Sequence, residues 1–450
     1  MDTLTDDRIK KGLSVFGKRM DGKLFSHLNS CVHCGLCAES CIYYLAEPKG
    51  KFIPAVKVDL ISSVYKSYLT FTGKIAPWLV GARKLEEKTV SEMIDLFYGA
   101  CTLCGRCVPH CSIGVDISFL VRKGREMLAR MGYVPQTLQN TINTALSTGN
   151  NMGISDQEIT ETLKWLEDDL RFEVNDEDAR IPLNEKGKKI LYTLNPREPK
   201  FFPLSVSAMA KIFHTAVESW TLSTRMYDVT NYAYYSSNPD DAAVITNRLF
   251  DEMNNLEAKT CVLAECGHGS RAFRWEGPNY IGKAYPFEVI TSVELLANYI
   301  QEGRISVDPG RITEPVTLHD PCNLARTGGI WKEQRFILNR CVQNFVEMTP
   351  NGIDNLCCGG GGGQLAMSEY NERRMKIGKL KFEQIRQTGA KIVVTPCHNC
   401  VDQLTQLNVQ YKLGIQIKTV AEIVGDAIIT DKKPKQSSDE KPLNFVLNNE

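Results

Sequence analysis

The alternation of apolar and polar residues along the chain predicts a helical N-terminal part followed by α/β structure. Apolar residues recur at the spacing of a helix face in four segments, namely 54–69, 84–97, 331–348 and 369–388. Short apolar runs typical of buried strands cover 314–319 and 391–395, and a cysteine follows closely behind each of them. Cysteines that follow strands gather at one edge of an α/β layer, where functional sites in such folds usually form.

Sixteen cysteines are the first compositional feature that changes this picture. Four of them lie in 31–41, four in 101–111 and the remaining eight in 261–400. In a reducing compartment such cysteines should not form disulfides. Their clustering therefore indicates metal centres.

The remaining composition excludes several classes of protein. A length of 450 residues allows two or three domains, and the 43% apolar and 24% charged contents are those of an ordinary globular protein. Equal numbers of basic and acidic residues, 53 of each, argue against a nucleic-acid-binding protein. No stretch reaches the ~18 apolar residues of a membrane span, and the first residues lack the apolar core of a signal peptide. We therefore expect a cytoplasmic protein without a membrane span of its own.

Two cysteine runs share the spacing of bacterial ferredoxins. Residues 31–41 read CVHCGLCAESC and residues 101–111 read CTLCGRCVPHC. This spacing is typical of [4Fe–4S] cubanes, with the fourth cysteine of each run binding the other cluster. We therefore predict one cubane on Cys31, Cys34, Cys37 and Cys111, and a second on Cys41, Cys101, Cys104 and Cys107. A pair of zinc knuckles is the alternative, but zinc sites use two separated Cys-x-x-Cys pairs rather than three cysteines on one tight loop.

The runs also depart from a compact ferredoxin. Ile42 and Ser112 stand where proline usually follows the fourth cysteine, and the segment between the runs is too long for that fold. The helical periodicity of this segment instead favours a helical ferredoxin domain with both clusters embedded among helices. His33 and His110 lie inside the runs, but the cysteines already supply enough ligands, so we expect both histidines to be surface or supporting groups.

A second constellation contains five cysteines. Cys322 stands in TLHDPCNLAR, Cys357 and Cys358 in NLCCGGGGG, and Cys397 and Cys400 in TPCHNC. Side chains of adjacent residues point in different directions, so neighbouring cysteines bind a single metal ion poorly. One [4Fe–4S] cubane takes four cysteines, and a fifth implies a different cluster. A glycine-rich hinge beside two core cysteines is the alternative.

These three motifs resemble the cysteine-rich CCG domains in the B and D subunits of heterodisulfide reductase. The resemblance implies that all five cysteines hold a non-cubane [4Fe–4S] cluster at which disulfides are cleaved. It also implies that adjacent cysteines bind different irons of one elongated cluster. Gly359, Gly360 and Gly361 would let the backbone approach this cluster closely, and their N–H groups would donate hydrogen bonds to its sulfurs.

Family members of this size carry two such domains in tandem as a pseudo-symmetric pair, and here the first domain has lost its ligands. Residues 258–273 parallel 390–405, with Cys266 matching Cys397 but Gly269 standing where Cys400 would be. This pattern most resembles the K subunit of the sulfite-reductase-associated membrane complex (DsrK) and the TmcB and HmcF subunits of related sulfate-reducer complexes. We therefore predict four parts: a helical ferredoxin domain (1–185), a degenerate CCG half (186–310), an intact CCG half (311–430) and a flexible tail (431–450).

Other residues near the motifs allow a core position or more than one role. Cys341 lies on the apolar side of a helix and Cys261 starts a buried strand, which places both in the core. Cys266 is either a relic or a group that faces the intact site with His268 as a proton donor. Three residues that flank ligand cysteines either orient their loops, deliver protons or serve as hydrogen-bonded structure, namely His319, Asp320 and His398.

The motifs together indicate an iron–sulfur oxidoreductase subunit. Cubanes pass one electron at a time, whereas disulfide reduction needs two electrons and two protons, so the five-cysteine cluster would hold a substrate sulfur between the two transfers. The resemblance implies a position on the inner face of the cytoplasmic membrane, held there by partner subunits. One partner would be a cytochrome b-type or quinone-reactive membrane subunit. The substrate would be a disulfide or trisulfide of a small protein such as DsrC, or of a thiol pair.

Two other functions share these sequence features. One is a pure electron-transfer subunit between a flavoprotein or quinone-reactive partner and another carrier. The other is the iron–sulfur subunit of an oxidoreductase for a hydroxy acid such as glycolate or lactate.

Overall fold

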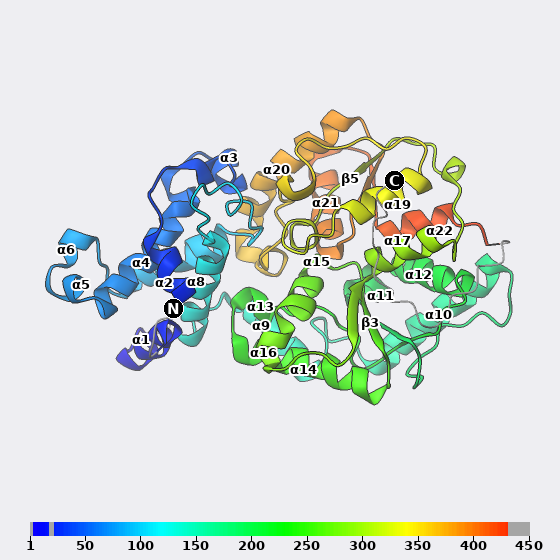
Figure 1. Ribbon diagram of the computed structural model, residues 1–450, viewed down its shortest axis with the longest axis horizontal. Coiled ribbons are helices and arrows are strands. Elements are labelled where there is room, and N and C mark those ends of the chain that lie inside the picture. Colours follow the sequence, from blue (N-terminus) through cyan, green and yellow to red (C-terminus); the bar gives the residue numbers. More distant parts are fainter. Residues whose placement is uncertain (1–2, 18–21, 431–450) are drawn as a thin grey trace. The chain divides into compact units, whose positions relative to one another are not determined.

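The computed structural model describes residues 3–17 and 22–430, and the predicted flexible tail at 431–450 lies outside the described residues. The chain forms two compact units, each built from several segments of the sequence (Figure 1). Unit 1 consists of Met1–Thr141, Tyr232–Ala242 and Leu356–Lys381, and unit 2 of Ile142–Asn231, Ala243–Asn355 and Phe382–Glu450. Two later segments of the chain belong to unit 1 and residues 142–185 belong to unit 2, while the predicted domain limits stay a prediction.

Unit 1 is helical. Its helices are α1 (Asp6–Leu13), α2 (Gly22–Asn29), α3 (Ile42–Ala46), α4 (Pro54–Leu69), α5 (Phe71–Ile75), α6 (Pro77–Val80), α7 (Glu87–Ile94), α8 (Ile117–Arg130) and α13 (Ala233–Ser236). The helix predicted at 54–69 is α4, which begins with a proline whose fixed φ suits the first helical position. The helix predicted at 84–97 is α7, which continues into a π-helical turn over Asp95–Gly99.

Unit 2 contains two parallel sheets. The first has the order β2-β1-β3-β4 and the second the order β5-β6-β7. The strands are β1 (Ile190–Tyr192), β2 (Trp220–Leu222), β3 (Thr260–Leu263), β4 (Glu288–Thr291), β5 (Val316–Leu318), β6 (Ile392–Val394) and β7 (Gln416–Lys418). The strands predicted at 314–319 and 391–395 are therefore β5 and β6, and they pair in parallel with Val316 opposite Ile392. Parallel pairing aligns the carboxyl ends of these strands, which are the ends that the cysteines follow.

The helices of unit 2 connect and cover these strands. They are α10 (Asp156–Val174), α11 (Arg197–Phe201), α12 (Pro203–Thr215), α15 (Gly267–Gly269), α16 (Gly277–Ile281), α17 (Ser292–Glu302), α18 (Cys322–Ala325), α19 (Lys332–Cys341), α21 (His398–Tyr411) and α22 (Val420–Ala427). Three further helices begin in one unit and end in the other, namely α9 (Gln136–Thr148), α14 (Pro239–Asn255) and α20 (Asn371–Thr388). The last of these agrees with the helix predicted at 369–388.

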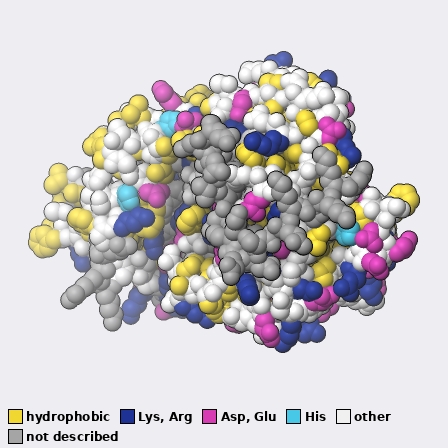
Figure 2. Space-filling model, turned by 45° about the vertical axis from the view of Figure 1, so that its right-hand side comes forward, with side chains coloured by type: hydrophobic (Ala, Val, Ile, Leu, Met, Phe, Trp, Pro, Cys, Tyr) yellow, Lys and Arg dark blue, Asp and Glu magenta, His cyan; other side chains and the backbone are white. Residues whose placement is uncertain are grey.

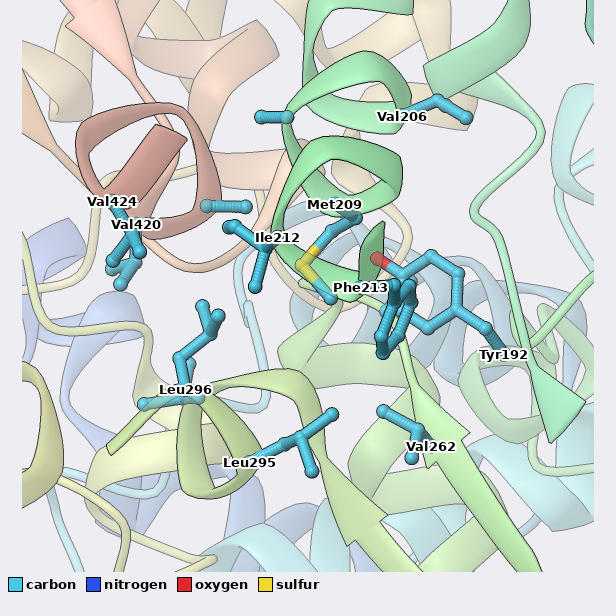
Figure 3. Packing of buried hydrophobic residues seen from close by; sticks show 14 of the residues in the cluster. Tyr192, Val206, Met209, Ile212, Phe213, Val262, Leu295, Leu296, Val420 and Val424 are labelled. Atoms are coloured by element: carbon cyan, nitrogen blue, oxygen red, sulfur yellow. The ribbon is translucent and has the colours of Figure 1, made fainter. Parts of the chain in front are cut away.

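The apolar core of unit 2 is shared by helices and strands. Figure 3 shows Ile212 and Phe213 of α12 between Val424 of α22 on one side and Tyr192 of β1 on the other. The Phe213 ring also stacks on Trp220 with their centroids 4.5 Å apart. Each such side chain contributes roughly 1.5–3 kcal/mol when it is fully buried. This shared core fixes the strand ends from which the cysteine loops leave.

The helix predicted at 331–348 is shorter than expected, because α19 ends at Cys341. The residues that follow lie alongside β5 instead: Val316 N–H donates to Asn344 O at 2.8 Å, and Val346 N–H donates to Val316 O at 2.8 Å. The apolar spacing of 342–348 thus serves an extended segment. Strand β5, with which this segment pairs, lies elsewhere in the sequence, so the periodicity of 342–348 cannot show that the helix ends early.

No helix in the described part of the chain is long and apolar enough to cross a membrane. Within unit 2 the segments around Cys266 and Cys397 share a local arrangement. Strand β3 leads to Cys266, which caps α15, and strand β6 leads to Cys397, which caps α21.

Candidate iron–sulfur sites

Four cysteines line one cavity in unit 1, namely Cys31, Cys34, Cys37 and Cys111. The first three come from one run and the last from the other. His33 and Gly35 have positive φ values of 57° and 82°, which curl the chain so that three thiols converge. The cavity therefore combines the four cysteines that the sequence groups together.

The second cavity of unit 1 has the complementary set of cysteines, namely Cys41, Cys101, Cys104 and Cys107. Leu103 and Gly105 repeat the positive φ values at the equivalent positions of this run, 52° and 70°. The two cavities are neighbours, because Ile117 lines both of them.

The chemistry of both cavities fits a cluster that supplies positive charge. Burial raises the pKa of the Cys37 and Cys107 thiols, so thiolates there need a nearby cation. Lys57 is buried and lines the second cavity. Tyr43 lines it too, and its buried hydroxyl has no hydrogen-bond partner among the described residues, which leaves it able to donate to a cluster sulfur.

The two histidines inside the runs bond to other groups. His33 Nε2 lies 2.6 Å from Asp59 Oδ1, and His110 Nδ1 lies 2.9 Å from the carbonyl oxygen of Arg106.

The double cysteine belongs to unit 1, where both thiols are buried. Gly359 N–H donates to Cys357 Sγ at 3.4 Å, and Gly360 N–H donates to Cys358 Sγ at 3.5 Å. Gly359 has a φ of 99°, a backbone conformation that residues other than glycine rarely adopt. The backbone donors that the sequence suggests for these glycines are therefore present.

The glycine run lies directly on the second ferredoxin run. A Cβ at Gly362 would lie 2.6 Å from the carbonyl carbon of Thr102, and one at Gly361 would lie 2.9 Å from its oxygen. Cys357 Sγ lies 3.5 Å from Thr102 Oγ1. Glycine is required here for close approach to the residue after Cys101.

A fully buried arginine fixes this approach. Arg125 donates to the carbonyl oxygens of Cys101 at 2.8 Å and Gly362 at 2.8 Å. It also donates to Phe97 O and Tyr235 O. Sequence reasoning missed both Arg125 and Thr102. In the sequence, Arg125 looks like any exposed helix residue and Thr102 like any loop residue.

The other three cysteines of the constellation belong to unit 2. Cys322 is the first residue of α18, Cys397 caps α21 and Cys400 lies in the first turn of that helix. Asp320 holds the loop after β5: Arg335 donates to its carboxylate at 2.8 and 3.0 Å, and Gly352 N–H donates at 2.7 Å. Asp320 thus orients the loop that presents Cys322.

Two buried carboxyl groups lie near His398, and sequence reasoning missed both. His398 Nε2 is 3.1 Å from Glu198 Oε1, and His398 N–H donates to the backbone oxygen of Glu265 at 2.9 Å. Burial alone would lower the pKa of His398, but the Glu198 carboxylate raises it to about 9. Burial raises the pKa of Glu265 to about 8, although its carboxyl accepts hydrogen bonds from Val420 and Ala421.

The segment around Cys266 has no room for a cysteine at position 269. A Cβ at Gly269 would lie 2.9 Å from Val229 O, so a cysteine side chain does not fit there. Gly269 N–H instead donates to Cys266 Sγ at 3.2 Å. Burial lowers the pKa of His268 to about 4, and its Nε2–H donates to Asn231 O at 2.7 Å. His268 is therefore neutral near pH 7.

Cys261 and Cys341 lie in the core of unit 2. Cys261 is on β3 and Cys341 ends α19, and neither is exposed. Burial raises the pKa of the Cys341 thiol to about 12, so this thiol stays protonated and unreactive.

Both groups of cysteines lie in segments that match families of iron–sulfur or cysteine-rich domains. A family model for the 4Fe-4S dicluster domain matches residues 27–115, and one for the cysteine-rich CCG domain matches residues 316–405. Similar proteins include an Hdr-like menaquinol oxidoreductase iron-sulfur subunit 2 from Archaeoglobus fulgidus, which is 28% identical over 92% of this chain and 81% of its own. The D subunit of the dihydromethanophenazine:CoB–CoM heterodisulfide reductase from Methanosarcina barkeri is 24% identical over 93% of this chain and 98% of its own.

Two segments of the chain thus match the dicluster and CCG domains, and the chain is similar to the D subunit of heterodisulfide reductase and to Hdr-like oxidoreductase subunits. The resemblance drawn from the cysteine motifs is confirmed at this level.

Proposed function

We propose that this chain is the iron–sulfur subunit of a membrane-associated oxidoreductase that reduces, or in reverse forms, a disulfide. Two cubanes would be held by the two sets of four cysteines that line the cavities of unit 1. The third, non-cubane [4Fe–4S] cluster would be held by Cys322, Cys357, Cys358, Cys397 and Cys400. These five lie inside the single segment that matches the CCG domain, which supports treating them as one ligand set.

The observation that carries this proposal is the contact between the second ferredoxin run and the double cysteine. Cys357 Sγ lies 3.5 Å from Thr102 Oγ1, and Thr102 directly follows Cys101. Cys101 is a proposed ligand of the second cubane. The next residue, Thr102, contacts Cys357, which is a proposed ligand of the third cluster. An electron can pass along this short route without leaving unit 1.

Electrons would be exchanged with the partner at the first cubane. Cys34 is exposed, and Val32 beside it is 63% exposed. The second cavity has more buried walls, since Tyr43 and Thr102 are both buried. This gradient supports a route that runs from the surface, through the second cubane, to the double cysteine.

The bound clusters would supply single-electron steps, and two such steps with two protons convert one disulfide to two thiols. The protein's part is to hold the sulfurs and set their electrostatics. The N–H groups of Gly359 and Gly360 donate to ligand sulfurs, and the buried charge of Arg125 lies close by. Both stabilise added negative charge, which favours the reduced state.

The names of the relatives support a quinol-type electron donor and a small disulfide substrate. The Archaeoglobus fulgidus relative is named for menaquinol, and the Methanosarcina barkeri relative for dihydromethanophenazine and the CoB–CoM heterodisulfide. We propose that the donor here is a cytochrome b-type or quinone-reactive subunit in the membrane. The acceptor is the disulfide or trisulfide of a small protein of the DsrC kind, or of a thiol pair. The local likeness between the Cys266 and Cys397 segments supports a tandem origin for the two halves.

The test is to purify the protein anaerobically and examine its iron. Three clusters predict about 12 iron atoms per chain. The Cys358→Ala variant should lose the third cluster and its spectroscopic signal while both cubanes stay reducible. Cys341→Ala is the matched control, because this buried cysteine lies outside every proposed ligand set, and it should keep all three clusters.

A substrate test separates disulfide chemistry from simple electron transfer. Oxidation in the presence of a dithiol should produce a paramagnetic signal that is absent without thiol. If no thiol changes the spectrum while electrons still reach a soluble carrier, the chain is an electron-transfer subunit only. An iron content near zero with bound zinc would contradict both functions.

A further inference from the structure

Helices α5 and α6 of unit 1 carry large apolar side chains that face solvent. Phe71 is 79% exposed, Trp78 80% and Leu79 75%, and Ile75 is exposed as well. Figure 2 shows hydrophobic side chains gathered at the left, over these two helices. We call residues 69–84 the α5–α6 tip. Contiguous exposed apolar groups of this size mark an interaction surface.

The tip is a formed structure rather than a loose loop. Thr70 Oγ1 accepts a hydrogen bond from Gly73 N–H at 3.1 Å and donates one to Lys66 O at 2.8 Å. A Cβ at Gly73 would lie 2.0 Å from Lys66 O, so this turn excludes any side chain. Arg83 N–H donates to Ser63 O at 3.1 Å, which ties the end of the tip back to α4. The apolar side chains are therefore held outward by the fold.

The segment that forms the tip carries only basic charged residues, and the last part of it is tied to an acidic residue through the ion pair of Arg83 with Glu92 at 2.6 Å. No acidic residue occurs between Asp59 and Glu86, whereas four basic residues do, namely Lys66, Lys74, Arg83 and Lys84. Segments that lie in the interface of a bilayer typically combine tryptophan and phenylalanine with lysine and arginine. Protein–protein interfaces are depleted in lysine, which disfavours a protein as the occupant of this surface.

We propose that the α5–α6 tip inserts into the headgroup layer of an anionic lipid bilayer and anchors unit 1 to the membrane directly. Phe71, Trp78 and Leu79 would enter the acyl boundary, while the lysines contact anionic headgroups. The sequence predicts membrane association only through partner subunits, and the tip adds a contact of the chain's own. This proposal does not depend on the chemistry of the clusters.

The experiment uses the full chain with its clusters loaded and lipid vesicles without any partner protein. The protein should sediment with phosphatidylcholine vesicles that contain phosphatidylglycerol, and less with phosphatidylcholine alone or at high salt. The double variant Phe71→Ser/Trp78→Ser should bind at least about tenfold more weakly, because two large apolar groups no longer leave water. Both positions are exposed, so the fold and the iron content should be unchanged.

Phe172→Ser is the matched control. Phe172 is 87% exposed on α10 of unit 2, and its loss should leave vesicle binding intact. Brominated lipids should quench tryptophan fluorescence in the wild type and markedly less in Trp78→Phe, which keeps an aromatic anchor. Failure to bind any vesicle, or equal binding by the double variant, overturns the proposal. Retention on membranes only when a co-expressed protein subunit is present would also overturn it, in favour of a protein occupant.

Discussion

Arg125→Lys should destabilise unit 1 far more than a charge-conserving change on a helix usually does. The Arg125 guanidinium makes five hydrogen bonds to four buried carbonyl oxygens, at distances between 2.7 and 3.0 Å. A lysine ammonium has three donors on one atom, so at least two of these bonds are lost. Hydrogen bonds to charged groups contribute about 1.5–3 kcal/mol each, which gives a loss of about 3–6 kcal/mol in the free energy of unfolding.

The loss should also have a functional signature. Arg125 joins Cys101 O to Gly362 O, so its replacement loosens the glycine run from the second ferredoxin run. We expect both cubanes to remain reducible by a chemical donor, while reduction of the third cluster slows. Thermal unfolding measures the first effect, and rapid-freeze electron paramagnetic resonance after mixing with reductant measures the second.

Arg130→Lys provides the control on the same helix. Arg130 is partly exposed and donates to Glu126 at 2.9 Å, an ion pair worth less than about 1 kcal/mol. Equal stability of the two variants, or an unchanged rate of reduction of the third cluster in Arg125→Lys, would refute the reasoning.

Three further changes test separate parts of the structure. Thr102→Val removes the hydroxyl next to Cys357 but keeps its shape, so the reduction potential of the third cluster should fall in a redox titration; an unchanged potential would contradict a hydrogen bond to that sulfur. Gly269→Cys should lower the melting temperature through its clash with Val229 and add no iron, and a variant that gains iron would show that space was not what excluded the ligand. Glu265→Gln loses one of the two oxygens that accept hydrogen bonds from Val420 and Ala421, so it should be less stable than the wild type near pH 5, and this difference should shrink toward pH 8. The wild-type carboxyl keeps its proton in the folded protein up to about pH 8 but loses it near pH 4.5 when unfolded. The free energy of unfolding of the wild type should therefore fall by about 1.4 kcal/mol per pH unit between these values. Parallel pH profiles of the two proteins would contradict the raised pKa.

Periodicity predicts those elements whose burial follows from local sequence. Segment 54–69 has apolar residues at helical spacing and a proline at its start, and β6 is a run of β-branched residues. Both elements can therefore be predicted from their own sequence. The end of α19 is not readable, because the chain after Cys341 leaves the helix to lie beside β5, which ends more than twenty residues earlier in the sequence. Pairing across such a distance leaves no periodic trace.

The cysteine groups are predictable for a different reason. Ligands of one cluster must converge, so their spacing is constrained by chemistry and survives as a pattern. Supporting groups have no such constraint. Arg125 meets Gly362 across 237 residues of sequence, and Glu265 meets the N-terminus of α22 across 155. Only the fold brings these groups together.

The buried cations of unit 1 bear on the proposed clusters independently of any motif. Arg125 and Lys57 are both buried, and the guanidinium of Arg125 donates to carbonyl oxygens rather than to a carboxylate. A buried charge without a counter-ion costs several kcal/mol, so a stable fold keeps one only where a compensating charge is present. Lys57 lines the cavity proposed for the second cubane, and Arg125 donates to the carbonyl oxygen of its proposed ligand Cys101. An iron–sulfur cluster held by four thiolates is net negative, and it would supply an anion for both cations. If the proposed second cubane is bound there, these cations would stabilise its reduced state by offsetting the added negative charge.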